Sequence, residues 1–489
     1  MKLHKINLFL IFLITLTFYG YFIRPLDYNI ASRLGLVKAV VEEGSFSIDK
    51  YHEGELFTLD KAYVNGHYYS DKAIGASLLG VLVYLPIYEI SGQALPTDLF
   101  IMLVTMLAIS LPTALLAPLI YALVLQVTQD KRHAVIVALC IALGTPIFPY
   151  AGSFYGHSLA ALLAFAAFAI WIPVRQFDQP ITIRLLFLSG LLIGLMVLAE
   201  YTSPLIAIFL IGYMAVVIKS KRTFWNWRSV LWFALGGLLP FILFASYNWI
   251  CFGSPLSVGV AYESYADFQD TYEGGIMGFH WPNLKSLLYM TAHPLTGIFT
   301  VSPILFMALF GIIALYRNSK WQAELWTSLF IIIVNFLLVS GMKVWWGGDT
   351  FTIRYVIPVL PFFAMFLLFF PRKYDGLLLV LGILSFLPML VASATPFRYF
   401  HLFILAANQQ SMVVPWNTSV FVTELLPRFL HNQLTLTWGN YLFGIESWYL
   451  NVMIPTIIAG ALLLVYYTIN KTYRSESEVV KPVPDPTSI

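Results

Sequence analysis

The sequence predicts an all-α protein, built as a polytopic transmembrane helical bundle. Hydrophobic residues make up 59% of the 489-residue chain and charged residues only 11%, whereas a soluble domain carries about 25% charged residues. Apolar stretches long enough to cross a bilayer recur along the whole chain. Basic residues gather in short segments between these stretches, as is typical of cytoplasmic loops.

The first apolar stretch runs from Ile6 to Ile23 without a charge. It ends in tyrosines followed by Arg24, which is typical of the membrane interface. A secretory signal would have a shorter apolar core and a small-residue cleavage site. We therefore expect an uncleaved first transmembrane helix.

Charge parity sets the predicted topology. If the apolar segment 73–90 crossed the membrane, Lys131 and Arg132 would face outward and every later basic loop would flip with them. We therefore expect segment 73–90 at the outer interface and both termini in the cytoplasm. The twelve expected spans are 6–23, 99–127, 134–150, 158–173, 185–199, 202–218, 229–250, 295–316, 325–342, 355–371, 377–397 and 447–469.

The same parity defines one domain with long external loops. We expect residues 1–474 to form a single transmembrane domain in the cell (plasma or inner) membrane, followed by a disordered cytoplasmic tail over 475–489. A formal net charge of +3 gives no indication of a nucleic-acid partner. The four long external segments, where we expect the function to lie, are 24–98, 251–294, 343–354 and 398–446.

An amphipathic helix is expected at the start of the first external loop, 24–98. Ile30, Leu34, Val37 and Val41 are spaced by 4, 3 and 4 residues, so they share one face of a helix that we expect to lie flat in the interface. Gly44 is expected to end this helix.

A dense polar and aromatic stretch, residues 66–75, follows in the same loop. It contains Lys72 directly before the interfacial segment, so we expect this ammonium near the depth of the lipid headgroups. The start of the chain resembles the GT-C glycosyltransferases in the order of its features. Asp27 comes first, and an amphipathic helix with an arginine, a glycine, and an aromatic stretch ending in lysine follow it. The resemblance is strongest to the protein O-mannosyltransferase and lipid A aminoarabinose transferase branch. It covers the first 90 residues or so in motif and the remainder in topology, and its matching residues are Asp27, Tyr28, Arg33, Gly44, Tyr69 and Lys72.

The resemblance implies a GT-C-like bundle with interfacial helices in the first external loop. It implies an enzyme that moves a hexosyl or pentosyl group from a polyprenyl-phosphate donor to a lipid, glycan or protein acceptor on the extracytoplasmic face, with inversion. Asp27 would be the catalytic carboxylate, and Lys72 would bind the carrier phosphate. The chain departs from the family in having His157 where members often have an acidic residue, and Ala73-Ile74 where they often have two prolines.

The chemistry of such a transfer needs a base for the acceptor hydroxyl and cations for the leaving phosphate. Asp27 suits the first role, while Lys72, Arg354 and Arg33 suit the second. Each residue also has a structural interpretation. Asp27 could cap the amphipathic helix, Lys72 could anchor the interfacial segment, and Arg33 could snorkel or pair with Glu42 or Asp27.

A second set of external residues is expected to bind the sugar or the acceptor. Glu200 lies between two spans, where a carboxylate is costly and therefore a functional candidate. His157 lies in a similar turn, where it could instead be a cap, and paired tryptophans could belong to the interfacial belt. The full set is His157, Glu200, Tyr69, Trp345, Trp346 and Asp349.

We predict no metal, because His280 and His293 in the 251–294 loop form no pair with a carboxylate at metal-ligand spacing. We also expect no cofactor. The expected partners are a polyprenyl-phosphate sugar lipid and membrane lipids. A transporter or lipid flippase is the alternative, although the spans are nearly free of charge and show no repeat; a non-catalytic scaffold or a glycan ligase is a third. The glycosyltransferase hypothesis requires one outward-facing cavity, beside an apolar groove, lined by Asp27, Lys72, Glu200, His157 and Arg354.

Overall fold

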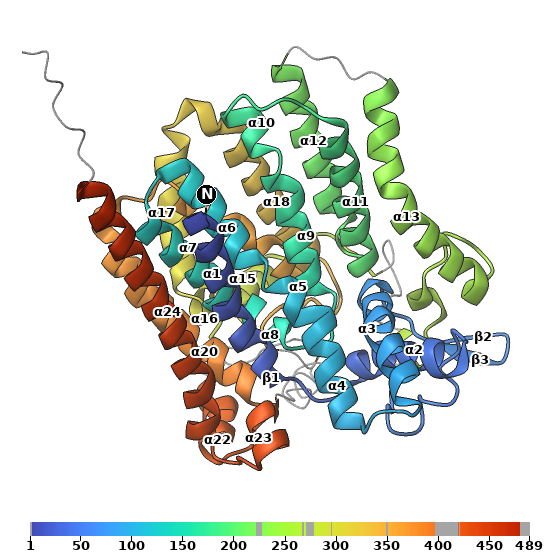
Figure 1. Cartoon of the computed structure of the whole chain (residues 1–489). Helices are drawn as coiled ribbons and strands as arrows, with labels where there is room; N and C mark the ends of the chain where they lie inside the picture. Colours follow the sequence, from blue (N-terminus) through green and yellow to red (C-terminus); the bar gives the residue numbers. More distant parts are fainter. Residues whose placement is uncertain are drawn as a thin grey trace, which may run out of the picture.

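The computed structural model confirms the all-α prediction. Helices form a bundle, and the described residues add only two short two-stranded sheets (Figure 1). The structure describes residues 2–221, 227–266, 268–269, 278–294, 296–348, 351–396, 419 and 421–479, with the side chains of residue 2 and of 473–479 excluded.

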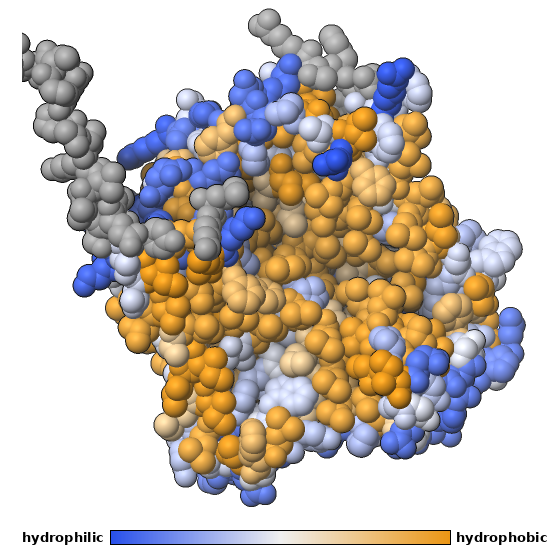
Figure 2. All heavy atoms as spheres, in the orientation of Figure 1, coloured by the Kyte–Doolittle hydropathy of each residue, from blue (hydrophilic) through white to orange (hydrophobic). Residues whose placement is uncertain are grey.

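Seven helices in the described part of the chain are long and apolar enough to cross a membrane. Five shorter apolar helices accompany them, and one of these is the segment that we expect at the interface. The number of spans therefore stays a prediction. In Figure 2 an apolar band crosses the surface between two more polar ends, as expected of a membrane protein. The seven long helices are Leu3–Tyr21, Thr97–Thr128, His157–Gln176, Trp227–Phe252, Ser319–Ser340, Arg372–Ala394 and Trp448–Thr472.

The first and last helices pack side by side. Helix α1 (Lys2–Tyr21) contacts α24 (Trp448–Val479), and the amide of Asn7 donates to the side chain of Asn470 at 3.1 Å. The start of α1 and the end of α24 therefore lie at the same end of the bundle (Figure 1). At the other end of α1, β1 (Phe22–Ile23) pairs antiparallel with β4 (Leu436–Thr437). Residues 480–489 of the predicted tail lie outside the described residues.

Helix α2 (Tyr28–Glu43) is the predicted amphipathic helix, with both expected ends. Asp27 is its N-cap, and Gly44 ends it in the left-handed conformation at φ 62°. The basic residues of this helix are not exposed, however. Arg33 and Lys38 are buried together with the apolar face, because α3 (Gly75–Ser91) and the loop after α2 cover it. The polar face of α2 therefore points into the protein.

A hairpin leads from α2 toward Lys72. Strands β2 (Ala62–Val64) and β3 (His67–Tyr69) pair antiparallel. They are joined by Asn65 and Gly66, both at positive φ, the conformation of the tightest hairpin turns.

The remaining elements complete the bundle around this loop. They are α4 (Thr97–Thr105), η1 (Met106–Ser110), α5 (Leu111–Thr113), α6 (Leu116–Thr128), α7 (Lys131–Leu143), α8 (Ile147–Ala151), α9 (His157–Ala169), α10 (Ile172–Gln176), α11 (Ile183–Ala199), α12 (Pro204–Ser220), α13 (Trp227–Phe252), η2 (Gly259–Tyr262), α15 (Leu284–Ala292), α16 (Ile298–Val301), α17 (Ile304–Tyr316), η3 (Ser319–Trp321), α18 (Gln322–Ser340), η4 (Arg354–Phe362), α19 (Phe363–Leu367), η5 (Arg372–Tyr374), α20 (Asp375–Ala394), η6 (Phe421–Leu425), α22 (Leu426–Leu430) and α23 (Trp438–Phe443).

Candidate active site

Asp27 is both a helix cap and the centre of a polar cluster. Its Oδ1 accepts from the backbone N–H of Ile30 at 2.8 Å. Its Oδ2 lies 3.0 Å from Arg24 and accepts from the Tyr155 hydroxyl at 2.5 Å. A carboxylate has about four acceptor positions, so these three contacts leave Asp27 room for one further donor. The cap and the functional role are therefore compatible.

Tyr155, between α8 and α9, joins Asp27 to the other predicted residues. Burial and the Asp27 carboxylate raise the pKa of Tyr155 well above its usual value, so the phenol stays protonated and donates. The guanidinium of Arg354 lies 5.4 Å from the centre of the Tyr155 ring. The ring of His157 stacks against Tyr155 with centres 5.8 Å apart.

His157 and Glu200 form a buried pair. Nδ1 of His157 lies 2.8 Å from Oε2 of Glu200, and both side chains are less than a tenth exposed. The close approach of two turns makes this possible, since a Cβ on Gly156 would lie 1.9 Å from the carbonyl oxygen of Ala199. Although burial opposes its charged form, His157 and the nearby guanidinium of Arg33 lower the pKa of Glu200 to about 2. Glu200 is thus paired with His157 rather than left alone between the two helices.

Arg33 connects this pair to the segment that follows Lys72. Its Nε donates to the side chain of Asn29 at 2.9 Å, and a terminal nitrogen donates to the carbonyl of Ala73 at 2.5 Å. Its charge also acts on the carboxylates of Glu200 and Asp71. The two structural partners considered from the sequence, Glu42 and Asp27, are therefore not the groups that hold Arg33.

Lys72 lies in an acidic cluster. Its ammonium lies 2.6 Å from Asp71 and 3.1 Å from Asp60. Its own side chain is only a tenth exposed, and Asp71 is fully buried. Ser32, on α2, donates to Asp71 at 3.4 Å, which fixes the cluster to the helix that Asp27 caps.

Glu263, which follows η2, is the third acid of this cluster. It is buried, and its carboxylate accepts from the backbone N–H of Ser264 at 2.9 Å. Burial and the neighbouring carboxylate of Asp71 raise the pKa of Glu263 to about 8, and burial also raises the pKa of Asp60. One carboxylate oxygen from each of the three acids lies within 4.8 Å of the others. A divalent cation could bridge that spacing, although the Lys72 ammonium already lies against two of them.

The structure therefore brings most of the predicted residues together. Six of the predicted residues are linked to one another by side-chain contacts and charge interactions, which pass through Tyr155, Arg33 and the acidic cluster. Trp345 and Trp346 pack against each other at 5.8 Å, and Trp345 contacts Tyr289 rather than this set. Tyr69 packs against Phe252 at 6.0 Å, and Asp349 lies outside the described residues. The linked set is Asp27, Arg33, Lys72, His157, Glu200 and Arg354.

Several polar members of the site were not selected from the sequence. Arg24 could have been found from its place three residues before Asp27, Asp71 from its place beside Lys72, and Tyr155 from its place between Gly152 and Gly156. Asp60 and Glu263 carry no local signal, because only the fold brings their two loops to Lys72. We call the whole group of linked residues the polar site.

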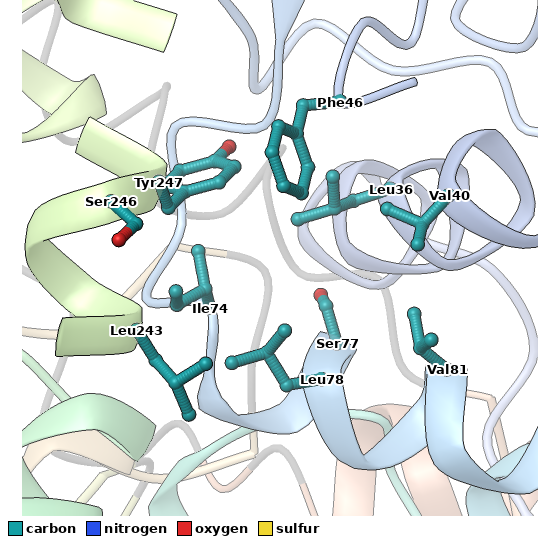
Figure 3. Close-up of a pocket in the computed structure, with 10 residues that line it drawn as sticks. All are labelled: Leu36, Val40, Phe46, Ile74, Ser77, Leu78, Val81, Leu243, Ser246 and Tyr247. Atoms are coloured by element: carbon teal, nitrogen blue, oxygen red, sulfur yellow. The ribbon is translucent and has the colours of Figure 1, made fainter. Parts of the chain in front are cut away.

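An apolar groove lies beside the polar site, between α2, α3 and α13. Figure 3 shows Leu36, Phe46 and Tyr247 on its walls. It encloses about 90 Å³. Ile74, two residues after Lys72, also lines it, and the hydroxyl of Tyr247 donates to the carbonyl of Ser70 at 2.9 Å. The groove is therefore continuous in sequence and contact with the acidic cluster.

Known structures include several that are similar to this one at low identity. ArnT from Cupriavidus metallidurans bound to undecaprenyl phosphate is 12% identical, with a TM-score of 0.45, and the match covers 94% of this chain and 70% of that one. Its apo structure gives 13% identity and a TM-score of 0.45, over 81% and 61% of the two chains. The oligosaccharyltransferase from Archaeoglobus fulgidus gives 13% identity and a TM-score of 0.46, over 80% and 54%.

The chain thus spans between about half and 70% of the length of these structures. ArnT and the archaeal oligosaccharyltransferase are members of the GT-C superfamily. No protein-family model matches the sequence, and no curated protein is significantly similar to it.

Proposed function

We propose that this protein is a GT-C glycosyltransferase that moves a sugar from a polyprenyl-phosphate donor to an acceptor on the extracytoplasmic face, with inversion. The observation that carries the proposal is the convergence of Asp27, Lys72, His157, Glu200 and Arg354 from distant segments into one polar site. The apolar groove shown in Figure 3 supports the proposal, because it lies beside the acidic cluster and could hold the isoprenoid tail of such a donor.

Asp27 would act as the base for the acceptor hydroxyl. Arg24 lies 3.0 Å from its Oδ2, and Tyr155 donates to the same oxygen. One acceptor position stays open on the carboxylate, and the side chain is 19% exposed. The group can therefore accept a proton as the acceptor oxygen attacks the anomeric carbon.

Lys72, Arg354 and Arg33 would stabilise the phosphate as it leaves. A charge that develops on a phosphate is best stabilised by cations held in place beforehand. Lys72 lies next to the apolar groove, where an isoprenoid tail would be shielded from water. Because Lys72 is paired with two aspartates, binding of the donor would require the ammonium to exchange a carboxylate for the phosphate.

A transporter would place its charged groups along a path near the middle of the bilayer. Here the polar site includes the first external loop and adjoins the end of α1. The arrangement favours catalysis at one face over passage through the bundle.

The test is a transfer assay with a panel of polyprenyl-phosphate sugars, using purified protein and its Asp27→Asn variant. Asparagine still caps a helix but is not a base, so we expect transfer to fall about 10²–10⁴-fold while the thermal unfolding curve in detergent stays close to that of the wild type. Full transfer by a folded Asp27→Asn protein would exclude this residue as the base. Absence of transfer by the wild type with every donor would refute the proposed function.

A further inference from the structure

Glu263 differs from the other two acids of the acidic cluster in its contacts. The Lys72 ammonium lies 2.6 Å from Asp71 and 3.1 Å from Asp60. One carboxylate oxygen of Glu263 lies within 4.8 Å of an oxygen of each aspartate, but no ion pair involves Glu263 among the residues that the structure describes. Three carboxylates therefore share one ammonium, and Glu263 is the acid that this ammonium does not contact.

The backbone holds Glu263 beside the cluster. Its backbone forms an antiparallel bridge with Ala62, at the start of β2. A Cβ on Gly259, in η2, would lie 2.6 Å from the Cα of Asp71, so the two segments pack this closely only because residue 259 is glycine. The Glu263 side chain is 4% exposed. Its place next to the aspartates is therefore set by the fold.

The two oxygens of the Glu263 carboxyl group have different surroundings. Oε1 accepts from the backbone N–H groups of Ser264 and Tyr265 at 2.9 and 3.2 Å. Oε2 is buried and has no donor in the described part of the chain. A buried acceptor without a donor is costly, whereas a protonated carboxyl group offers an O–H donor instead. Burial and the Asp71 carboxylate also raise the pKa of Glu263 to about 8, so at neutral pH Oε2 carries a proton.

The charged groups that act on Glu263 come from the two ends of the β2–β3 hairpin. Asp60 and Lys61 precede β2, and Asp71 and Lys72 follow β3. Ionisation of Glu263 would place a third negative charge beside the Lys72 ammonium. It would bind that ammonium more strongly to the cluster and repel a phosphate.

A phosphate can reach the Lys72 ammonium only if the ammonium leaves a carboxylate. Asp60 and Asp71 would then lie close together without their shared cation, which is unfavourable for two neighbouring buried charges. A protonated Glu263 beside them can donate its O–H to the carboxylate that the ammonium has left. An O–H bond to a carboxylate is short and among the stronger hydrogen bonds.

We propose that Glu263 is a positioning residue that releases Lys72 to the donor phosphate, because its O–H replaces the ammonium on an aspartate of the acidic cluster. This inference rests on the proposed function, since it assigns how the same site admits the phosphate. The exchange forms no covalent bond and leaves the proton on Glu263. A purely structural acid at this position would not make phosphate binding depend on its own ionisation.

The proposal is tested by calorimetric titration of the full-length protein in detergent with farnesyl phosphate at pH 7.5 and pH 9.5, with EDTA present. The second pKa of a phosphate monoester is about 6, so the probe has the same charge at both values. We expect the wild type to bind about tenfold more weakly at pH 9.5. The carboxylic acid band in its infrared spectrum should persist at pH 7.5 when the probe is bound.

Three variants separate the proton from the packing. Glu263→Gln keeps an N–H donor and cannot ionise, so it should bind at both pH values as the wild type does at pH 7.5. Glu263→Leu has no donor, and it should bind about tenfold more weakly than the wild type at pH 7.5. Glu53→Gln, the matched control, changes an exposed acid of the same loop and should follow the wild type at both values.

Several results would overturn the proposal. They are an equal wild-type affinity at the two pH values, a Glu263→Gln variant that loses affinity as the wild type does, wild-type affinity in Glu263→Leu, and absence of the infrared band. Binding that is independent of Glu263 in a protein that transfers sugar would reject this inference alone. Binding that depends on Glu263 as expected, in a protein that transfers sugar from no donor, would reject only the proposed function.

Discussion

The carboxylate of Asp27 and the ammonium of Lys72 lie in surroundings of opposite charge. Asp27 contacts the Arg24 guanidinium and the Tyr155 hydroxyl, and the Arg354 guanidinium lies 5.4 Å from the centre of the same ring. Lys72 lies among three acids, two of them within 3.1 Å.

The difference indicates how each group would act. The Asp27 carboxylate keeps one acceptor position open, where it would take a proton from an acceptor hydroxyl. The Lys72 ammonium is held by two aspartates, which it would have to leave to meet a phosphate. The Asp27 half is thus organised for proton transfer, and the Lys72 half for exchange of an anionic ligand.

Removing the positive charge of Lys72 from among its three acidic neighbours should have the largest effect on stability. Lys72→Met leaves two aspartates and Glu263 without their internal cation, and breaking a buried pair in this way costs about 3–5 kcal/mol. We expect a large fall in the melting temperature in detergent. The fraction of the variant that still folds should show a higher apparent KM for the donor. Lys72→Arg, the matched control, should recover most of the stability.

The acidic partners provide a cross-check on that prediction. Adding Asp60→Asn to Lys72→Met should cost less than the sum of the two single changes, because the residues share one interaction. Strict additivity in the unfolding free energies would show that the contact between Lys72 and Asp60 contributes little.

A smaller effect is expected in the Asp27 half from Tyr155→Phe. This change removes one hydrogen bond to a charged group, worth about 1.5–3 kcal/mol, and keeps the aromatic ring against Arg354. We expect a moderate loss of stability and a shift of the pH dependence of transfer, measured as log(kcat/KM) against pH. A variant with wild-type stability and an identical pH profile would show that the short contact to Asp27 has no energetic weight.

The smallest expected effects are on the pH dependence of stability, and the first of them concerns Glu263. The pKa of Glu263 is raised to about 8, so the folded state holds a proton that the unfolded chain releases. The resulting stabilisation is fully present below the ordinary carboxyl pKa and is lost as the pH rises through about 8. Glu263→Gln cannot ionise, and it should flatten the decline in melting temperature between pH 5 and pH 8. A decline that is the same in both proteins would contradict this assignment.

The Glu200 carboxylate should behave in the opposite sense. Its pKa is lowered to about 2, so its stabilising effect is present above the ordinary carboxyl pKa and disappears as the pH falls toward 2. Glu200→Gln should therefore lose stability at neutral pH but show a weaker acid dependence, measured by the same melting curves. If the melting temperature of Glu200→Gln fell at low pH as steeply as that of the wild type, His157 would not be what keeps this carboxylate charged.

The sequence by itself determined the fold class, the membrane character and the ends of α2. Apolar runs longer than a bilayer admit few other structures, and the caps of α2 depend on neighbouring residues, so Asp27 and Gly44 could be read from local pattern. The separate positions of Lys72, His157, Glu200 and Arg354 were also predicted, because charged and polar residues beside apolar spans are conspicuous.

Only the tertiary structure decided how these residues are paired. Burial of the polar face of α2 depends on α3 and the following loop, and Glu263 joins Asp60 and Asp71 from a loop far away in the chain. Contacts of this kind depend on which loops meet in the folded protein, and the periodicity of hydrophobic residues in the sequence does not predict which loops those are. The sequence therefore located the charges at one end of the bundle, whereas the fold decided that Asp27 lies among cations and Lys72 among acids.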